Sequence, residues 1–207
     1  MTVFADRFRD TLVNLGIPET TIDRLWSDLD RSYSRSRRHY HTLAHLEHLF
    51  QRTGPIMHLF ADLNAMVLAI AYHDAVYDTD RSDNEERSAE LARKTLEPLG
   101  IHCAIIDHCA EMIRATKAHA PSDDPDTNLF TDADLSILGS SPEAYVRYAE
   151  QVRREYGMYP DLLYRPGRRK VLTHFLAMPH IFKTEHFHRL FEEQARVNLR
   201  AELDRLA

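Results

Sequence analysis

Histidines and aspartates stand in this sequence at spacings that suit metal chemistry. The chain has 13 histidines among 207 residues, and their positions matter more than their number. His41 and His45 are four residues apart, so on a helix they would share one face. His73 and Asp74 end the most apolar segment of the chain, where burying both is costly unless they are paired or bound to a metal. These residues are therefore candidates for one shared site.

A second acidic pair, Asp132 and Asp134, follows a loop-like stretch of the chain. Neutral imidazole and ionised carboxylate together suit a divalent ion such as zinc, manganese, iron or cobalt. Two histidines and two aspartates leave coordination positions for water and substrate, and water bound there loses a proton near neutral pH. A His-Asp dipeptide alone is a weak motif, but its place at the polar end of an apolar helix favours a metal site.

The arrangement of these residues resembles the HD superfamily of metal-dependent phosphohydrolases, whose signature is His…His-Asp…Asp on separate helices. His45, His73, Asp74 and Asp134 occupy those places in order, which implies that they hold the metal. From about residue 33 to its end, the chain is similar to an uncharacterised bacterial branch of predicted HD phosphohydrolases. The stretches that carry this similarity are residues 40–45, 72–78, 83–89, 130–139 and 164–168.

The residue roles follow from a more distant similarity to the cyclic-nucleotide phosphodiesterases, which carry a Tyr-His-x-x-x-His segment. In those enzymes the first histidine gives a proton to the leaving group and the second binds metal. The resemblance implies that His41 is the general acid and His45 the ligand. Their metal-binding aspartate lies in an Ala-Asp-Leu-Ser segment, which implies that Asp134 is the last ligand and leaves Asp132 as its rival.

The segment after the His-Asp pair departs from many relatives. It reads Ala75-Val76-Tyr77 in place of Ile-Gly-Lys, so their substrates are not carried over. We expect one tightly held divalent ion per chain, with Mn, Fe, Co, Ni, Zn and Mg as candidates.

Several polar residues are candidates for contact with water or substrate. Carboxylates orient water or accept a proton, an amide hydrogen-bonds to the site, and arginines clamp phosphate through paired donors. For the glutamates an exposed first-turn acid is the competing interpretation, and for the arginines a solvated loop. The candidates are Asp132, Glu85 and Glu86 for proton handling, and Asn84, Arg165 and Arg168, with Arg169, for substrate.

The elements that must position these residues are helices. The chain has only six glycines and few alternating apolar and polar runs, which favours an all-α fold, a single HD-type helical bundle over residues 1–207. Residues 1–32 fall outside the clearest resemblance. Apolar spacing predicts a helix from a cap at Thr20 or Thr21, a buried helix over 66–72, and others starting at Ser141 and Thr184. Loops are expected at 78–84, 120–128 and 157–167.

Charge and composition limit the partners. A net charge of −6 and a pI near 6.1 argue against a nucleic-acid polymer as partner. The longest apolar stretch, 65–72, is too short to cross a membrane, and Cys103 and Cys109 offer no disulfide framework. We therefore expect a cytoplasmic protein that acts on a small phosphorylated molecule, nucleotides included. The charged C-terminal helix is a candidate homodimer interface.

The sequence is compatible with three functions. A metal-dependent phosphohydrolase acting on a small phosphoester is the main prediction. A non-catalytic HD module that binds metal and nucleotide as a sensor is the first alternative, and a helical interaction protein with incidental histidines is the second. A metallopeptidase is disfavoured because no His-Glu-x-x-His segment occurs.

Overall fold

A computed structural model describes residues 2–206, and the regular secondary structure within that range is entirely helical. It contains ten α-helices and three short 3-10 helices with no strand in the described part, which confirms the all-α prediction. No helix among the described residues is both long and apolar enough to cross a membrane. Contacts divide the chain into two compact units, one ending at Thr131 and the other starting at Asp132. The single-domain expectation stays a prediction.

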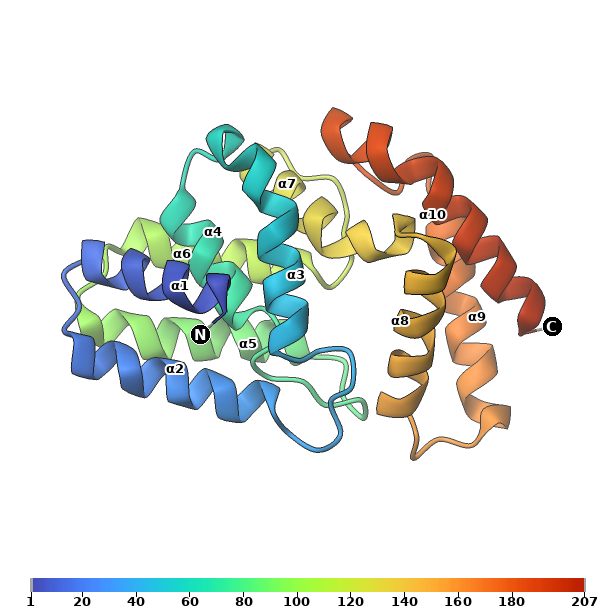
Figure 1. Ribbon diagram of the computed structural model, residues 1–207, viewed down its shortest axis with the longest axis horizontal. Helices are drawn as coiled ribbons and strands as arrows, with labels where there is room; N and C mark the ends of the chain where they lie inside the picture. The colour runs from blue at the N-terminus through green and yellow to red at the C-terminus, as the bar shows by residue number, and fades with distance from the viewer. Residues whose placement is uncertain (1, 207) are drawn as a thin grey trace. The chain divides into compact units, whose positions relative to one another are not determined.

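The first unit contains six helices and the beginning of a seventh (Figure 1). Two 3-10 helices, Gly54–Leu59 and Glu97–Leu99, join some of them. The α-helices are α1 (Val3–Asn14), α2 (Glu19–Tyr33), α3 (Leu43–Thr53), α4 (Leu63–Tyr72), α5 (Asn84–Leu96), α6 (Cys103–Ala115) and α7 (Pro125–Leu135), whose last residues belong to the second unit.

Helix α4 is the centre of the first unit. It packs against α1, α3, α5 and α6, and every residue from Ala65 to Tyr72 is buried, as its apolar sequence predicts (Figure 1). Asp62 caps its start by accepting from the amide of Ala65 at 2.9 Å. Asp126 secures the preceding turn by accepting from the amides of Ala61 and Asp62, at 2.9 and 2.8 Å. The helix is therefore a fixed support for the residues that follow Tyr72.

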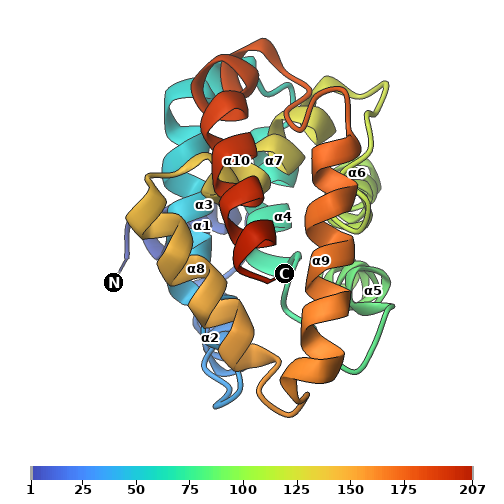
Figure 2. The same ribbon diagram turned by 90° about the vertical axis from the view of Figure 1, so that its right-hand side faces the viewer.

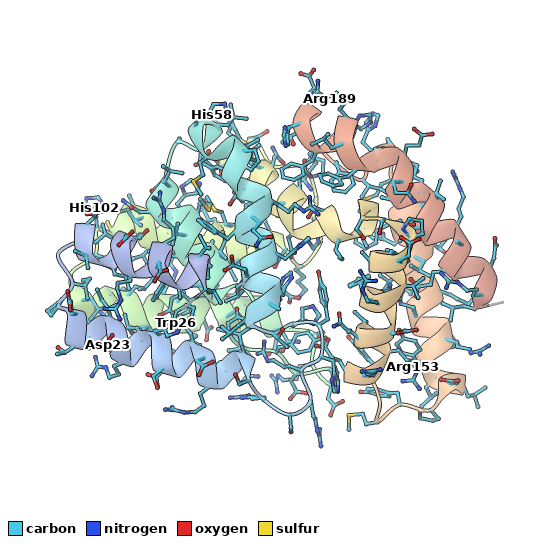
Figure 3. The ribbon with its side chains drawn as sticks, in the orientation of Figure 1. Asp23, Trp26, His58, His102, Arg153 and Arg189 are labelled. Carbon is cyan, nitrogen blue, oxygen red and sulfur yellow. The ribbon has the colours of Figure 1, made fainter. Side chains whose placement is uncertain are left out.

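The two N-terminal helices belong to the same core. Trp26 of α2, labelled in Figure 3, lies against the rings of Phe4 and Phe8 on α1, with centroids 6.3 and 5.8 Å away. The amide of Phe4 donates to Glu47 on α3 at 2.9 Å. Residues outside the clearest resemblance thus pack on the helix that carries His45.

The second unit contains α8 (Pro142–Glu155), α9 (Asp161–Ala177) and α10 (Glu185–Arg205), after a 3-10 helix over Ser136–Gly139. Helix α10 packs on α9 and on the 3-10 helix, and Figure 2 shows it between α8 and α9. Gly139 lies so close to Phe191 that a Cβ on Gly139 would come within 2.6 Å of its carbonyl oxygen, so glycine is required there. Asn198 of α10 donates to the carbonyls of Leu138 and Ser140, and these hydrogen bonds hold α10 against the 3-10 helix.

The helix boundaries agree in part with the sequence patterns. Ser141 caps α8 through the amide of Ala144, as predicted. Helix α2 starts earlier than expected, with Pro18 as its N-cap. The loop predicted over 157–167 is wrong beyond residue 160, because α9 runs through Pro166. Tyr164 and Arg168 are buried one turn apart, and their packing holds the helix through the proline.

Between α8 and α9 the connection is short and well bonded. Arg153, labelled in Figure 3, donates to the carbonyls of Tyr156 and Tyr159 at 2.9 and 3.0 Å. It also donates to Asp161 at 2.8 Å, at the start of α9. One arginine therefore fixes the turn that joins the two helices.

Candidate metal centre

The first unit brings together three of the four predicted ligands. His45 lies in the first turn of α3, and His73 and Asp74 follow the last residue of α4. The Nε2 atoms of His45 and His73 are 3.0 Å apart. The Oδ2 atom of Asp74 is 3.1 Å from Nε2 of His73 and 3.6 Å from Nε2 of His45. Both imidazoles are buried, so three ligand-type atoms converge where water has little access.

The size of this triangle fits a first-row divalent ion. With ligands about 2.1 Å from the metal, neighbouring ligand atoms are about 3.0 Å apart in octahedral geometry and about 3.4 Å apart in tetrahedral geometry. The observed edges of 3.0, 3.1 and 3.6 Å span that range. Two imidazoles and a carboxylate suit zinc, iron, cobalt, nickel or manganese. The three residues therefore fit one face of a coordination shell and leave other positions for water and substrate.

The protonation of His73 suits this role. Its Nδ1 atom lies 3.0 Å from the carbonyl oxygen of Ile70, and because a carbonyl only accepts, Nδ1 carries the hydrogen. In the neutral ring the lone pair is then on Nε2, which faces His45 and Asp74. Metal-binding histidines commonly donate a hydrogen bond from the ring nitrogen that does not bind the metal, and that hydrogen bond fixes the orientation of the ring.

The carboxyl of Asp74 is held in its charged form. Burial opposes its ionisation, but the positive charge of His73, His41 and His45 in their protonated forms, together with a hydrogen bond from protonated His73, outweighs burial and holds the pKa of Asp74 below its usual range. The side chain keeps 18% of its exposure, which leaves one side of the carboxylate open. Asp74 is therefore the anionic member of the centre at neutral pH.

His41 lies beside the ligands, although not on the helix expected for it. Thr42 is extended and forms the N-cap, so α3 begins only at Leu43 and the prediction that His41 and His45 share a helix is wrong. The Nε2 atom of His41 is nevertheless 4.0 Å from Oδ2 of Asp74, and its ring lies 4.3 Å from that of Tyr77. With 20% of its side chain exposed, His41 stands at the rim of the centre.

Tyr33 positions the backbone of Asp74, although no sequence motif predicts it as part of the site. Its hydroxyl donates to the carbonyl of Ala71 at 3.1 Å and accepts from the amide of Asp74 at 3.2 Å. The ring is 1% exposed, so both hydrogen bonds are shielded from water. The apolar spacing of α2 indicates that Tyr33 is buried, but nothing in the sequence indicates what its hydroxyl bonds to.

Tyr33→Phe is expected to weaken both the fold and the centre. The change leaves the buried Ala71 carbonyl and Asp74 amide without this partner, which costs about 1–3 kcal/mol of the free energy of unfolding. Loss of an indirect support for a ligand typically lowers metal affinity by roughly 10–100-fold. Urea unfolding and a metal titration of the same variant check the two effects. Unchanged metal affinity would show that Asp74 does not need this anchor.

Arg38 joins the two segments that carry the site. Its guanidinium donates to the carbonyl of His41 at 3.0 Å and to that of Ala75 at 3.2 Å, and it lies over the ring of Tyr33. The basic run 35–38 suggests a solvated helix end or a local anion site. The buried guanidinium of Arg38 instead holds the His41 segment against the turn after Asp74.

Two residues of α5 hold the chain that follows the centre. Asn84 accepts from the amide of Asp78 at 3.1 Å and donates to its carbonyl at 2.8 Å. Ser88 makes the same pair of bonds with Val76, at 3.1 and 3.2 Å. Asn84 thus closes the loop between α4 and α5, and its contact with substrate stays a prediction.

The two glutamates have different surroundings. Glu86 is exposed and accepts from Arg114 of α6 through both oxygens at 2.8 Å, so its carboxylate bridges α5 and α6. Glu85 is half-buried at the start of α5. These contacts give Glu86 a structural role, while proton handling by Glu85 stays a prediction.

Asp132 and Asp134 belong to the second unit. Asp132 is fully buried, accepts from the amides of Lys183 and Thr184 and from the Thr184 hydroxyl, and pairs with the Lys183 ammonium at 2.9 Å. It therefore fixes the segment that enters α10. Asp134 is half-buried near the end of α7, and its place as the last ligand stays a prediction.

The arginine candidates lie on α9, also in the second unit. Arg168 is buried and donates to both oxygens of Glu202 at 2.8 and 2.9 Å, while Tyr145 donates to the same carboxylate. Because the guanidinium of Arg168 already pairs with Glu202, the geometry gives Arg168 a structural role. Arg165 is half-exposed and lies 3.9 Å from Asp161, and Arg169 donates to the Leu203 carbonyl. Substrate binding by Arg165 stays a prediction.

Glu202→Gln is expected to destabilise the second unit most at neutral pH. Burial raises the pKa of Glu202, but hydrogen bonds and charge from Arg168 outweigh it and leave the pKa below its ordinary value. The carboxylate therefore contributes stability above the unfolded pKa of about 4.3, and this is lost as pH falls through the folded value. Breaking a buried pair costs about 3–5 kcal/mol at pH 7. Urea unfolding between about pH 7 and pH 3 should show the difference from wild type shrinking; a constant difference would contradict it.

Comparison with known proteins adds no relative. No protein-family model, no curated protein and no solved structure matches the chain. The resemblance to HD phosphohydrolases therefore stays a prediction from sequence motifs.

Proposed function

We propose that the chain is a metal-dependent phosphohydrolase that acts on a small phosphoester, with nucleotides among the candidate substrates. One observation carries this proposal. The ligand atoms of His45, His73 and Asp74 lie 3.0 to 3.6 Å apart, and a further imidazole, His41, comes within 4.0 Å of the same carboxylate oxygen. A binding site needs only the ligands, whereas an additional imidazole at the rim supplies a group that transfers protons near neutral pH.

His45, His73 and Asp74 would hold the ion. When bound, a divalent ion polarises a phosphoryl oxygen and promotes the ionisation of water. The carboxylate of Asp74 balances part of the positive charge, and the hydrogen bond from His73 to Ile70 keeps its imidazole in one tautomer. Helix α4 supports His73 and Asp74, and its packing against α3 keeps His45 beside them.

His41 would hold the proton that the leaving group needs. In hydrolysis a water oxygen bonds to phosphorus, the bond from phosphorus to the leaving oxygen breaks, and that oxygen takes a proton from Nε2 of His41. The ring of Tyr77 lies 4.3 Å from the ring of His41 at 32°, which limits its rotation. The exposed edge of His41 allows solvent to return the proton after each turnover.

A panel of phosphomonoesters, phosphodiesters and nucleotides tests the proposal. Each compound is incubated with metal-free protein supplied with Mn, Co, Ni, Zn or Mg, and released phosphate or alcohol is measured. We expect turnover with at least one metal, abolished by a chelator. Saturable nucleotide binding without turnover would support the sensor alternative. A chain that binds none of these metals would support the helical interaction protein.

A further inference from the structure

We propose a second metal site in the second unit, formed by His180, His188 and Glu192. Each of these residues offers a ligand atom that lies within 4.8 Å of the other two. His188 and Glu192 are one turn apart on α10, so they share a face of that helix. His180 reaches the same point from the segment between α9 and α10.

The two imidazoles are available to a metal. Their ring centroids are 4.9 Å apart, with ring planes at 77°. Both side chains are exposed, and within residues 2–206 no hydrogen bond reaches their ring nitrogens, so a metal displaces only water. Tetrahedral ligand atoms lie about 3.4 Å apart, and rotation of two exposed side chains can close the remaining difference, which is at most about 1.4 Å.

The carboxylate of Glu192 is ionised and oriented. Burial raises its pKa, but hydrogen bonds from the amides of Phe182 and Ile181 and from Arg196 outweigh burial and lower it. Those three donors lie at 3.0, 2.9 and 2.7 Å. An ionised carboxylate has about four lone-pair sites, so one remains for a metal. The same donors hold the carboxylate in one orientation, as supporting residues do around metal ligands.

The backbone on both sides of His180 is already anchored to α10. Arg196 donates to the carbonyls of Met178 and Pro179 at 2.8 and 3.0 Å. On the other side, the Ile181 amide donates to Glu192. A metal therefore does not need to order this segment, and the entropic cost of bringing a loop ligand to a helix is small.

The donor set defines the class of ion. Two neutral imidazoles and one carboxylate favour zinc, nickel, copper or cobalt over magnesium and calcium, which prefer oxygen ligands. An ion bound there would cross-link the α9–α10 segment to α10. Asp132 holds the end of the same segment at Lys183 and Thr184, so the ion would add stability to a connection that is already tied.

Zinc titration of the metal-free full-length chain by calorimetry tests this site. His180→Ala and His188→Ala change exposed side chains, so both variants should fold. Each is expected to bind one equivalent of zinc less than wild type. His174→Ala is the matched control, because His174 is an exposed histidine of α9 outside the cluster, and it should bind as much zinc as wild type.

The result is separable from the metal centre of the first unit. In an Asp74→Ala background, the zinc equivalent that depends on His180 and His188 is expected to remain. Failure of the phosphohydrolase proposal would therefore leave this site standing. If His180→Ala and His188→Ala both bind as much zinc as wild type, or if only Asp74→Ala changes the stoichiometry, the second site is refuted.

Discussion

Asp74→Ala is expected to lose the bound divalent ion and phosphohydrolase activity together. Asp74 supplies the only carboxylate among the three converging ligands of the first unit, and its Oδ2 lies within 3.6 Å of both ligand nitrogens. Removal leaves two neutral imidazoles, which hold a divalent ion far less well. The loss of metal affinity should exceed the roughly 10–100-fold effect of removing a supporting hydrogen bond. Metal content after dialysis and phosphate release are measured on the same sample.

Asp123→Ala serves as the control for this variant. Asp123 is an exposed aspartate in the first unit, outside the metal-ligand cluster, so its replacement should leave metal content and activity at the wild-type level. Full metal stoichiometry in Asp74→Ala would mean that the ligand set is wrong. Retained activity without metal would remove the basis for the proposed reaction.

His41→Ala is expected to keep the metal and to lower turnover by roughly 10²–10⁴-fold, the usual contribution of a general acid. The geometry separates the two properties, because Nε2 of His41 is 4.0 Å from Asp74 while the ligand atoms lie closer together. The defect should be smaller for a phenolic leaving group such as p-nitrophenol, which departs without protonation. Turnover of an alkyl ester and of p-nitrophenyl phosphate, compared at saturating metal, measures this difference.

The control for His41→Ala is His58→Ala. His58, labelled in Figure 3, is exposed on the 3-10 helix after α3 and outside the cluster, so its loss should leave turnover unchanged. Loss of metal from His41→Ala would assign His41 to the ligands. An equal defect for both leaving groups would assign it a positioning role.

The sequence predicts the central helix, and the convergence of three candidate ligands beside it, for a clear physical reason. Residues 66–72 are apolar on every face, and burial of such a segment is the strongest signal in the chain. A histidine and an aspartate at its polar end are costly to bury unless they are paired or bound to a metal, so only a few kinds of partner can stabilise them there. Loop boundaries are less predictable. Pro166 suggests a break, but the burial of Tyr164 and Arg168 overrides its local preference.

Residues that act through backbone contacts cannot be predicted in this way. The hydroxyl of Tyr33 meets Asp74, which is 41 positions away, and neither spacing nor composition indicates that pairing. Arg38 sits in a basic run that is typical of a solvated surface, and only the fold shows its two carbonyl partners. For Asp132 and Arg168, a buried structural partner competes with the predicted role in the site, and sequence alone does not reveal the partner.

The complete burial of α4 has a consequence for how the site behaves in time. Amide hydrogens in a helix enclosed on every face exchange with solvent only through large opening events, so the supports of His73 and Asp74 persist through local fluctuations. His41 lies on a non-helical segment and does not share that protection. Two of the residues proposed to hold the metal therefore follow the slowest-exchanging helix of the first unit, whereas the backbone of the proposed proton donor depends on the hydrogen bond from Arg38.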